Sequence, residues 1–380
     1  MKEFKNFFRN QFLKVICRTK LWRILCNTPI GSINSIEELL TSNKICYIDE
    51  FDGIKVRKEP IHYYKEVHWK FDLFKSRFSE KNYVVEAKNW YVWGNQGCVI
   101  TDNGYVVTPV SREYDNQVHS IFQQFKLIHS KKINGTIAVI AASGANVYYH
   151  WMVDILPRIQ LLKDSGNFHR VDKFILNYQG LPFQKESLKK LEIDESKLIV
   201  TNNHWSFHGQ AETLLIPSFV SPLDIVSPYT INFLRNYFLG ASATITNKRS
   251  RIYIKRINGR RIINEAEIEE YLLGIGFISV SLENYSIEEQ AKLFNSAEYI
   301  IGAHGAGFTN LVFCEPETIV VDIFSPLWVN PCYWTIACEL NLDYRYMIGE
   351  GDRPQNGIDL KGKGENIILD LEKFKKLMLI

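Results

Sequence analysis

The second half of the chain alternates between short apolar runs and amphipathic stretches. The apolar runs fit buried strands, and the stretches between them repeat apolar positions at helical spacing; the clearest examples are strand-like residues 251–256, 277–282 and 318–324 and helical residues 263–276 and 286–297. Alternating strands and helices are typical of a doubly wound parallel sheet. Ligands of such a sheet bind beyond the carboxyl ends of its strands.

The alternation of strands and helices begins earlier, at residue 135. Residues 135–142 predict a buried strand and residues 143–166 a turn and a helix, and further strands and helices follow to about residue 219. Ser227 and Pro228 then indicate the start of another helix, with a capping serine and a proline in its first turn.

Before residue 135 the pattern changes to short alternating runs. Residues 45–110 are rich in Val, Tyr and Trp and are broken by glycines, which predicts a small antiparallel sheet with a hairpin turn at 102–104. Residues 32–40 predict a short helix. Together these patterns predict an α/β fold with this domain plan: a basic segment at 1–30, an N-terminal α/β domain at 31–225, a linker helix and loop at 226–248, a C-terminal α/β domain at 249–350 and a tail with a helix at 351–380.

Composition narrows the class of protein. The chain has 380 residues, of which 46% are hydrophobic and 23% charged, as in a folded protein with one or two large cores. A net charge of +3 is too small to indicate nucleic acid as a partner. The cysteines form no CxxC pair or metal-like cluster, which indicates reduced thiols, a cytoplasmic location and no bound metal.

Positive charge is concentrated at the N-terminus. Residues 1–28 carry one acid, Glu3, and seven basic residues: Lys2, Lys5, Arg9, Lys14, Arg18, Lys20 and Arg23. Apolar residues between them follow helical spacing, so the segment predicts an amphipathic helix on the anionic inner face of the cytoplasmic membrane. The alternative is a basic helix that packs on the protein's own body.

One helix combines three polar residues on an otherwise apolar face. His150, Asp154 and Arg158 are spaced four apart within residues 143–166. One interpretation is a cleft-lining helix, with Asp154 or His150 as a general base. The other is a structural set, in which Asp154 pairs with Arg158 and His150 is a satisfied core residue.

A second group of candidates lies at two predicted strand ends. The turn 303–307 contains His304, Gly305, Ala306 and Gly307 before a short helix with Asn310, and the loop 255–261 contains Arg256, Arg260 and Arg261. Backbone N–H groups and guanidinium forks suit phosphate oxygens, so these residues predict a nucleotide diphosphate site, although glycines in such a turn also serve tight packing alone. No P-loop, GxGxxG or D-x-D pattern accompanies them, which favours a mechanism without a metal or another cofactor.

Three separated segments resemble glycosyltransferase family 61, including its bacterial capsule and surface-polysaccharide members. They are YYHWMVDILPRI (148–159), RIYIKRINGRRIINEAEIEEYLLGIGF (251–277) and EEQAKLFNSAEYIIGAHGAGFTNLVFCEPETIVVDIF (288–324). The resemblance implies two Rossmann-like domains of the GT-B type with a cleft between them. It also implies an inverting transferase, with the donor in the C-terminal domain and the acceptor toward the N-terminal one.

The resemblance also implies roles for particular residues. The donor diphosphate would contact the arginine loop and the 304–307 turn with Asn310, and Asp322 would face the donor's sugar or ribose. Asp154, or else His150, would be the base, and Arg158 and Trp151 would line the acceptor cleft. We therefore expect a nucleotide-sugar donor and a polysaccharide or lipid-linked glycan acceptor. A non-catalytic glycan-binding scaffold is the main alternative, and a hydrolase that uses His150 and Asp154 is a further one.

Overall fold

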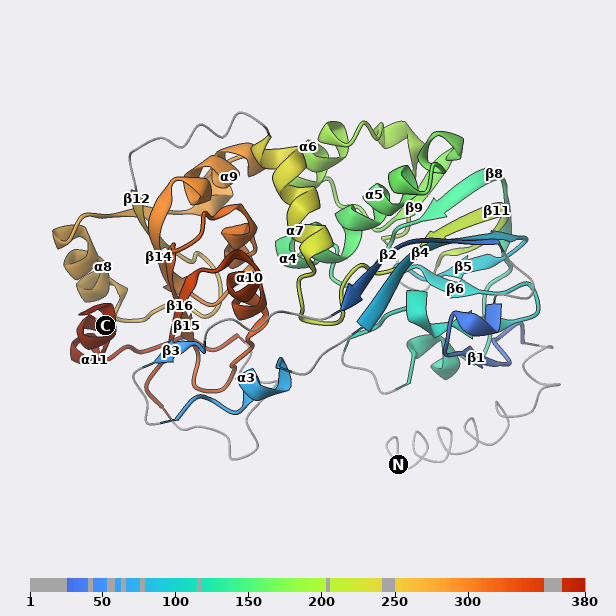
Figure 1. Ribbon diagram of the computed structural model, residues 1–380. Helices are drawn as coiled ribbons and strands as arrows, with labels where there is room; N and C mark the ends of the chain where they lie inside the picture. The colour runs from blue at the N-terminus through green and yellow to red at the C-terminus, as the bar shows by residue number, and fades with distance from the viewer. Residues whose placement is uncertain are drawn as a thin grey trace, which may run out of the picture. The chain divides into compact units, whose positions relative to one another are not determined.

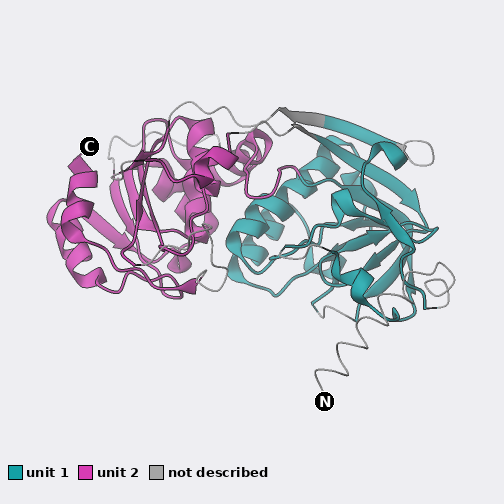
Figure 2. Cartoon of the chain, turned by 90° about the horizontal axis from the view of Figure 1, so that it is seen from below, with its two compact units in different colours: residues 1–49, 81–219 teal, residues 50–80, 220–380 magenta. Residues whose placement is uncertain are grey.

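The computed structural model describes residues 26–39, 44–52, 59–62, 66–75, 79–114, 118–202, 206–240, 250–351 and 364–379. The predicted membrane-binding segment 1–28 therefore lies almost wholly outside the described residues. The chain forms two compact units (Figure 2): unit 1 comprises residues 1–49 and 81–219, and unit 2 comprises residues 50–80 and 220–380. The predicted N-terminal domain 31–225 thus differs from unit 1, because residues 50–80 belong with unit 2.

Unit 1 is built on one mixed sheet of ten strands. Eight of them follow one another across the sheet in the order β1-β7-β6-β5-β11-β8-β9-β10, and β4 pairs with both β11 and β2. The strands on one side are parallel: β11 (His208–Pro217), β8 (Lys131–Val139), β9 (Lys173–Leu176) and β10 (Leu198–Val200). The antiparallel part comprises β4 (Ser79–Lys88), β5 (Tyr91–Trp93), β6 (Cys98–Ile100) and β7 (Tyr105–Val107), next to β2 (Lys44–Asp52) and β1 (Gly31–Ile33). The predicted hairpin turn 102–104 is confirmed between β6 and β7.

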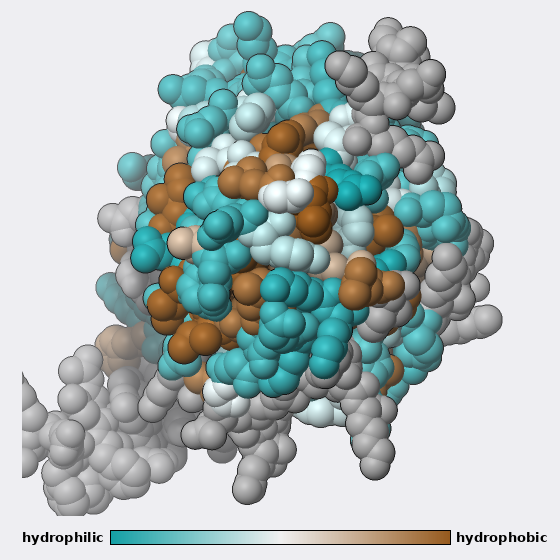
Figure 3. Space-filling model, turned by 90° about the vertical axis from the view of Figure 1, so that its left-hand side faces the viewer, coloured by the Kyte–Doolittle hydropathy of each residue, from teal (hydrophilic) through white to brown (hydrophobic). Residues whose placement is uncertain are grey.

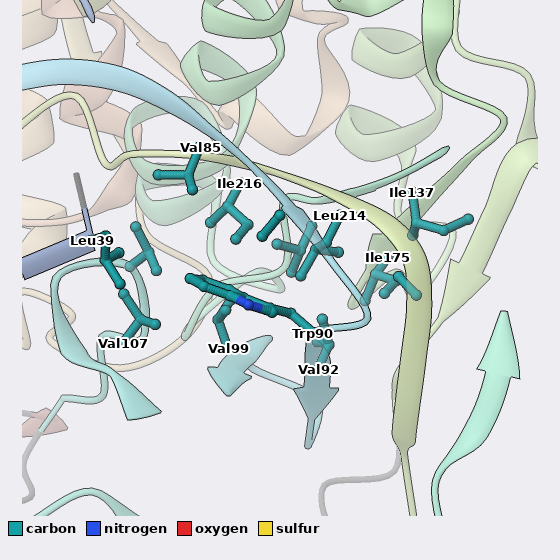
Figure 4. Close-up of a cluster of buried hydrophobic side chains, with 14 of the residues drawn as sticks. Leu39, Val85, Trp90, Val92, Val99, Val107, Ile137, Ile175, Leu214 and Ile216 are labelled. Atoms are coloured by element: carbon teal, nitrogen blue, oxygen red, sulfur yellow. The ribbon is translucent and has the colours of Figure 1, made fainter. Parts of the chain in front are cut away.

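The prediction of a separate small antiparallel sheet is wrong. Strand β11 pairs antiparallel with β4 and β5 and parallel with β8, so it joins both parts into one sheet. Figure 4 shows why: Trp90, next to β5, packs in one core with Val99 of β6, Ile137 of β8 and Leu214 of β11. A shared apolar face buries more surface than two small sheets could bury separately.

The predicted helix at 32–40 is also corrected. Residues 31–33 form β1, which pairs in parallel with β7, and only a 3-10 turn, η1 (Glu37–Leu39), follows. The other short 3-10 elements of unit 1 are η2 (Thr108–Val110), η3 (Ser120–Gln123), η5 (Phe168–Arg170) and η6 (Glu195–Lys197). Helix α6 (Pro182–Lys190) connects β9 to β10.

The predicted helix within 143–166 is present, but part of it has π-helical rather than α-helical geometry. It comprises α4 (Tyr148–His150), a π-helical turn η4 (Trp151–Ile155) and α5 (Leu156–Asp164). Pro157 has no N–H for the carbonyl of Val153, so the helix loses one regular hydrogen bond where the π turn ends. π turns are frequent at functional sites.

Unit 2 contains the predicted doubly wound parallel sheet. Its order is β13-β12-β14-β15-β16-β3, and all neighbours are parallel. The strands are β12 (Ser250–Ile254), β13 (Phe277–Val280), β14 (Ala297–Ala303), β15 (Ile319–Phe324), β16 (Asp343–Ile348) and β3 (Ile61–His62). The chain passes from β12 to β13 on one side and then to β14 on the other, so the topological switch point lies between β12 and β14.

Helices cover both faces of this sheet (Figure 1). Helices α8 (Glu265–Gly274) and α11 (Leu371–Leu379) share a core with one face, whereas α9 (Ile287–Asn295), η9 (Ala306–Phe313) and α10 (Cys332–Leu340) lie on the other. The remaining helical elements of unit 2 are α3 (Lys70–Leu73), α7 (Pro228–Leu234), η7 (Arg235–Leu239) and η8 (Leu282–Asn284). The predicted helix from Ser227 is therefore confirmed, with Ser227 capping it.

Residues 59–75 extend unit 2 in a way that no sequence pattern indicates. Strand β3 has two residues and pairs with the edge of β16. Phe71 of α3 is fully buried, with its ring 4.8 Å from Tyr346 and 5.3 Å from Trp334. A two-residue strand and a single anchoring aromatic residue leave no periodic signal.

The face of unit 2 that carries α8 and α11 mixes apolar and hydrophilic surface (Figure 3). Leu273 of α8 and Leu379 of α11 are exposed, and apolar areas alternate with polar ones on the face that Figure 3 shows. Within the described ranges, no helix has the length and apolar character needed to cross a bilayer.

Candidate functional site

The turn after β14 places His304 at the carboxyl end of that strand, beside the switch point. The imidazole Nδ1 lies 2.9 Å from Oδ2 of Asp322 on the neighbouring strand β15. The Tyr344 hydroxyl, on β16, donates to the same carboxylate oxygen over 2.7 Å. His304 and Asp322 are both buried. Three adjacent parallel strands therefore fix the orientation of one imidazole.

Burial lowers the pKa of His304, and the charge of Asp322 opposes this shift only in part. The imidazole is consequently neutral near pH 7, with its Nδ1–H directed at Asp322. No residue that the structure describes makes a hydrogen bond to Nε2 of His304. This nitrogen can accept a hydrogen bond from a hydroxyl, and a phosphate at the same place would favour the protonated, donating form.

Arg256 follows β12 and lies directly on the His304 turn. Its Nη1 donates to the carbonyl of His304 over 2.6 Å, and its Nε donates to the carbonyl of Gly259 over 2.9 Å. A Cβ on Gly305 would lie 1.7 Å from this Nη1. Gly305 is therefore needed for the close approach of the guanidinium, which explains why a glycine follows His304.

Arg260 places a second guanidinium near the first. Burial lowers the pKa of both side chains, that of Arg256 to about 10, and the charge of Arg260 adds to the effect on Arg256. The nearby acids Asp322 and Glu283 offset this only in part. Within the described residues, the Arg260 guanidinium has neither a hydrogen-bond acceptor nor a carboxylate partner. Two largely desolvated guanidinium groups without an ion pair favour a bound anion.

The other predicted donor residues have different surroundings. Arg261 is exposed, so of the two alternatives the structure brings Arg260 toward His304. Gly307 provides room for packing, because a Cβ there would lie 2.7 Å from Cδ1 of Leu282. Ala306 begins η9 and is partly exposed.

Asn310 lies in a buried hydrogen-bond network. It is fully buried, and its Nδ2 donates to Oε1 of Gln290 over 2.7 Å and to the carbonyl of Gly307 over 3.1 Å. The side chain thus ties η9 to α9, and both distances are those of hydrogen bonds within a core. A donor could reach it only if this network opened.

In unit 1, His150 and Asp154 form the predicted pair. Nδ1 of His150 lies 2.7 Å from Oδ2 of Asp154, and the Tyr114 hydroxyl donates to the same oxygen over 2.8 Å. Tyr114 also stacks on the imidazole, with ring centroids 4.7 Å apart, and Arg112 lies 3.8 Å from Oδ1 of Asp154. The His150 side chain is 22% exposed, against 6% for Asp154. The histidine is therefore the accessible member of the pair.

Arg158 and Trp151 are not at an open surface, contrary to their predicted place in an acceptor cleft. Both are fully buried. Arg158 donates to the carbonyls of Val139, Ala141 and Pro217, all over 3.0–3.1 Å, and so binds the ends of β8 and β11. Trp151 donates its indole N–H to Ser187 over 2.8 Å. Their roles are structural, and Arg158 does not pair directly with Asp154 as the alternative supposed.

Sequence reasoning missed the tyrosines at both sites. Tyr344 lies in a strand, where a buried tyrosine is an ordinary core residue, and Tyr114 lies in an irregular loop about 40 residues before Asp154. Tyr333 of α10, whose ring lies 4.9 Å from His304, was likewise part of an apolar pattern. Only the three-dimensional contacts identify them. In the described part of the chain, no group of three or more His, Cys, Asp or Glu residues could hold a metal ion, and the absence of a metal requirement stays a prediction.

In a comparison with known protein families, the stretch of the chain that carries both sites matches one family. Residues 148–321 match the family Glycosyltransferase 61. This stretch of the chain is therefore similar to glycosyltransferases of that family. The matched region includes the His150–Asp154 pair, the arginine loop and the His304 turn, and it ends one residue before Asp322.

Several curated proteins are similar to parts of this chain. "Beta-1,2-xylosyltransferase RCN11" of Oryza sativa subsp. japonica is 29% identical over 129 residues, which are 32% of this chain and 24% of that protein. "Beta-1,2-xylosyltransferase" of Arabidopsis thaliana is 32% identical over 100 residues, 23% and 19% of the two chains. "Protein O-linked-mannose beta-1,4-N-acetylglucosaminyltransferase 2" of Xenopus laevis is 26% identical over 213 residues, 51% and 35%. The chain thus spans about a fifth to a third of these relatives.

Proposed function

We propose that the protein is an inverting, metal-independent glycosyltransferase that moves a sugar from a nucleotide diphosphate donor to a glycan acceptor. The observation that carries this proposal is the pair of guanidinium groups of Arg256 and Arg260 at the switch point of unit 2, neither of which has a carboxylate partner among the described residues. The names of the relatives, all sugar transferases, support the same reaction class.

The donor diphosphate supplies the anion that these two guanidinium groups favour. Arg256 is already held by backbone carbonyls, so its position costs little reorganisation when the diphosphate binds. Both guanidinium groups then stabilise the negative charge that develops on the leaving diphosphate, which a metal ion would otherwise do. His304, oriented by Asp322, contacts a phosphate or a hydroxyl of the donor through Nε2.

His150 is the base in this proposal, and Asp154 positions it. The carboxylate accepts from Nδ1, which leaves Nε2 of the more exposed imidazole to take the proton of the acceptor hydroxyl. The acceptor oxygen forms the new bond to the anomeric carbon as the bond to the diphosphate oxygen breaks, and the leaving group departs with the negative charge. This order reverses the sequence-based preference for Asp154, because Asp154 is buried and already accepts from Tyr114.

The experiment is an assay of nucleoside diphosphate release from UDP-, GDP- and CDP-sugars, with and without acceptor glycans and with EDTA present. We expect release from one donor class, reduced by about 10²- to 10⁴-fold in His150→Asn. Asp154→Asn, which keeps a hydrogen-bonding amide, should retain more activity than His150→Asn. If the two variants lose activity in the opposite order, Asp154 is the base. If no donor is hydrolysed or bound, the protein is the non-catalytic scaffold.

The biological setting proposed for this reaction is cytoplasmic, on the inner face of the cytoplasmic membrane. The acceptor is then a surface polysaccharide or a lipid-linked glycan. The basic, amphipathic pattern of residues 1–28 supports this setting, because such segments bind anionic lipids.

A further inference from the structure

Unit 1 contains a pocket that neither candidate site accounts for. It has a volume of about 220 Å³ and lies beyond the carboxyl ends of β8, β9 and β10, the usual ligand position of a parallel sheet. Six of its eight lining residues carry a side-chain amide: Asn95, Gln96, Asn146, Asn177, Gln179 and Asn202. The other two are Gly144 and Ala145.

Two of the amides build the pocket. The amide of Asn177 accepts from the N–H of Ala142 over 3.2 Å and donates to its carbonyl over 2.6 Å. Asn202 contacts the backbone of Tyr178 in the same way, as acceptor and donor. Each side chain thus continues the pairing of parallel strands past their ends. The floor of the pocket is therefore fixed before any ligand arrives.

Other amides that line the pocket have no partners in the described part of the chain. Oε1 of Gln96 is buried and has no hydrogen bond to any described residue, a state that costs free energy unless a ligand supplies the donor. Gln179 and Asn146 are exposed at the rim, and their side-chain amides form no hydrogen bonds among the described residues. Amides offer donors and acceptors together, as the hydroxyl groups of a sugar require.

The pocket adjoins the His150–Asp154 pair through Gly144. This glycine lines the pocket, and a Cβ on it would lie 2.5 Å from Cδ2 of His150. Its φ of +76° is also a conformation that other residues adopt only with strain. One residue without a side chain thus separates the imidazole from the amide-lined space.

We propose that this pocket is a subsite for one neutral sugar residue of the acceptor glycan, an assignment that rests on the proposed transferase function. None of the described lining residues is charged or aromatic, which disfavours phosphate and nucleobase ligands. The volume lies below the roughly 300–1,000 Å³ of pockets for drug-sized ligands, so it suits a single sugar ring. Gln96 accepts from one sugar hydroxyl, and the rim amides contact others.

The test uses the full chain and saturation-transfer NMR with methyl glycosides of glucose, galactose, mannose, xylose and N-acetylglucosamine. Gln96→Met keeps the side-chain length but removes the unpaired oxygen, and Gln123→Met makes the same change at an exposed residue of η3 that does not line the pocket. We expect Gln96→Met to weaken binding by about fivefold or more, the worth of one hydrogen bond. Its melting temperature should stay equal or rise, because a buried unpaired acceptor is removed.

Two results would overturn the assignment: no glycoside contacts the wild-type protein, or Gln96→Met binds as well as Gln123→Met. Thermal shifts with UDP, GDP and CDP on the same samples separate this failure from that of the proposed function. Nucleotide binding without glycoside contact rejects only the subsite. If the wild-type protein binds no nucleotide, the proposed transferase function is rejected.

Discussion

Substitution of Gly305 by alanine tests the donor site without removing any charged group. The new Cβ would lie 1.7 Å from Nη1 and 2.8 Å from Cζ of Arg256. An ordinary contact is about 3.5 Å or longer, so the guanidinium must move by roughly 2 Å. Its 2.6 Å hydrogen bond to the His304 carbonyl is then lost.

The movement weakens nucleotide binding, while its cost to folding is that of one lost hydrogen bond. A hydrogen bond from a charged group contributes about 1.5–3 kcal/mol, so a misplaced Arg256 should weaken nucleotide binding by roughly 10- to 150-fold. The φ of Gly305 is −178°, which is extended backbone that alanine also adopts. The atom displaced belongs to a long, flexible side chain. The free energy of unfolding should therefore fall by no more than this hydrogen bond contributes, about 1.5–3 kcal/mol.

Gly307→Ala is the matched control, because its Cβ would meet Cδ1 of Leu282 at 2.7 Å and no guanidinium. It should lower the free energy of unfolding by about 1–3 kcal/mol and leave nucleotide affinity nearly unchanged. Calorimetric titration with the nucleoside diphosphate that wild type prefers, and urea unfolding, measure the two quantities. Wild-type affinity in Gly305→Ala would refute the placement of Arg256 at the donor.

Three further predictions concern folding, pH and membrane binding. Arg158→Met should lower the free energy of unfolding, measured by urea denaturation, by about 1–3 kcal/mol for each strand-end carbonyl of β8 and β11 that it leaves unpaired. A total effect below about 1 kcal/mol would contradict the structural role. Burial lowers the pKa of His304 and His208 below 6.5. The unfolded chain therefore binds more protons than the folded one, and the free energy of unfolding should fall as the pH drops below that value. His304→Gln should flatten this pH dependence, and an unchanged slope would count against a buried neutral imidazole. Deletion of residues 2–24, which leaves Cys26 and its hydrogen bond from Leu127 in place, should reduce sedimentation with anionic vesicles, whereas equal sedimentation would reject the membrane-binding segment.

Sequence patterns predicted most of the parallel sheet of unit 2 and some of the neighbours at each site. Periodic patterns identify long alternating elements well, and spacing of four residues was enough to pair His150 with Asp154. The strand-end rule brought Arg256 and His304 together correctly. Both inferences depend on local geometry that the chain repeats reliably.

Burial and long-range pairing could not be predicted in the same way. Arg158 carries a charge, yet it is fully buried because three strand-end carbonyls surround it. In the sequence, Asn310 resembles a ligand-binding residue. In the structure its amide donates instead to Gln290, 20 residues away. The mixed sheet of unit 1 depends on β11, which pairs with strands more than 100 residues earlier. Such contacts are set by the tertiary packing and leave no local pattern.

The most direct test of the donor site compares two neighbouring arginines. Arg260 is partly buried and has no ion pair within the described residues, whereas Arg261 is exposed, so alanine at each position removes the same charge in different surroundings. Thermal shift with UDP, GDP and CDP in the presence of EDTA measures binding, since a ligand at 100 times its Kd adds about 2.7 kcal/mol of stability. The account predicts one responsive nucleotide for wild type and Arg261→Ala, and a lost or much smaller shift for Arg260→Ala. Equal shifts for both variants, or no shift for wild type, would contradict it.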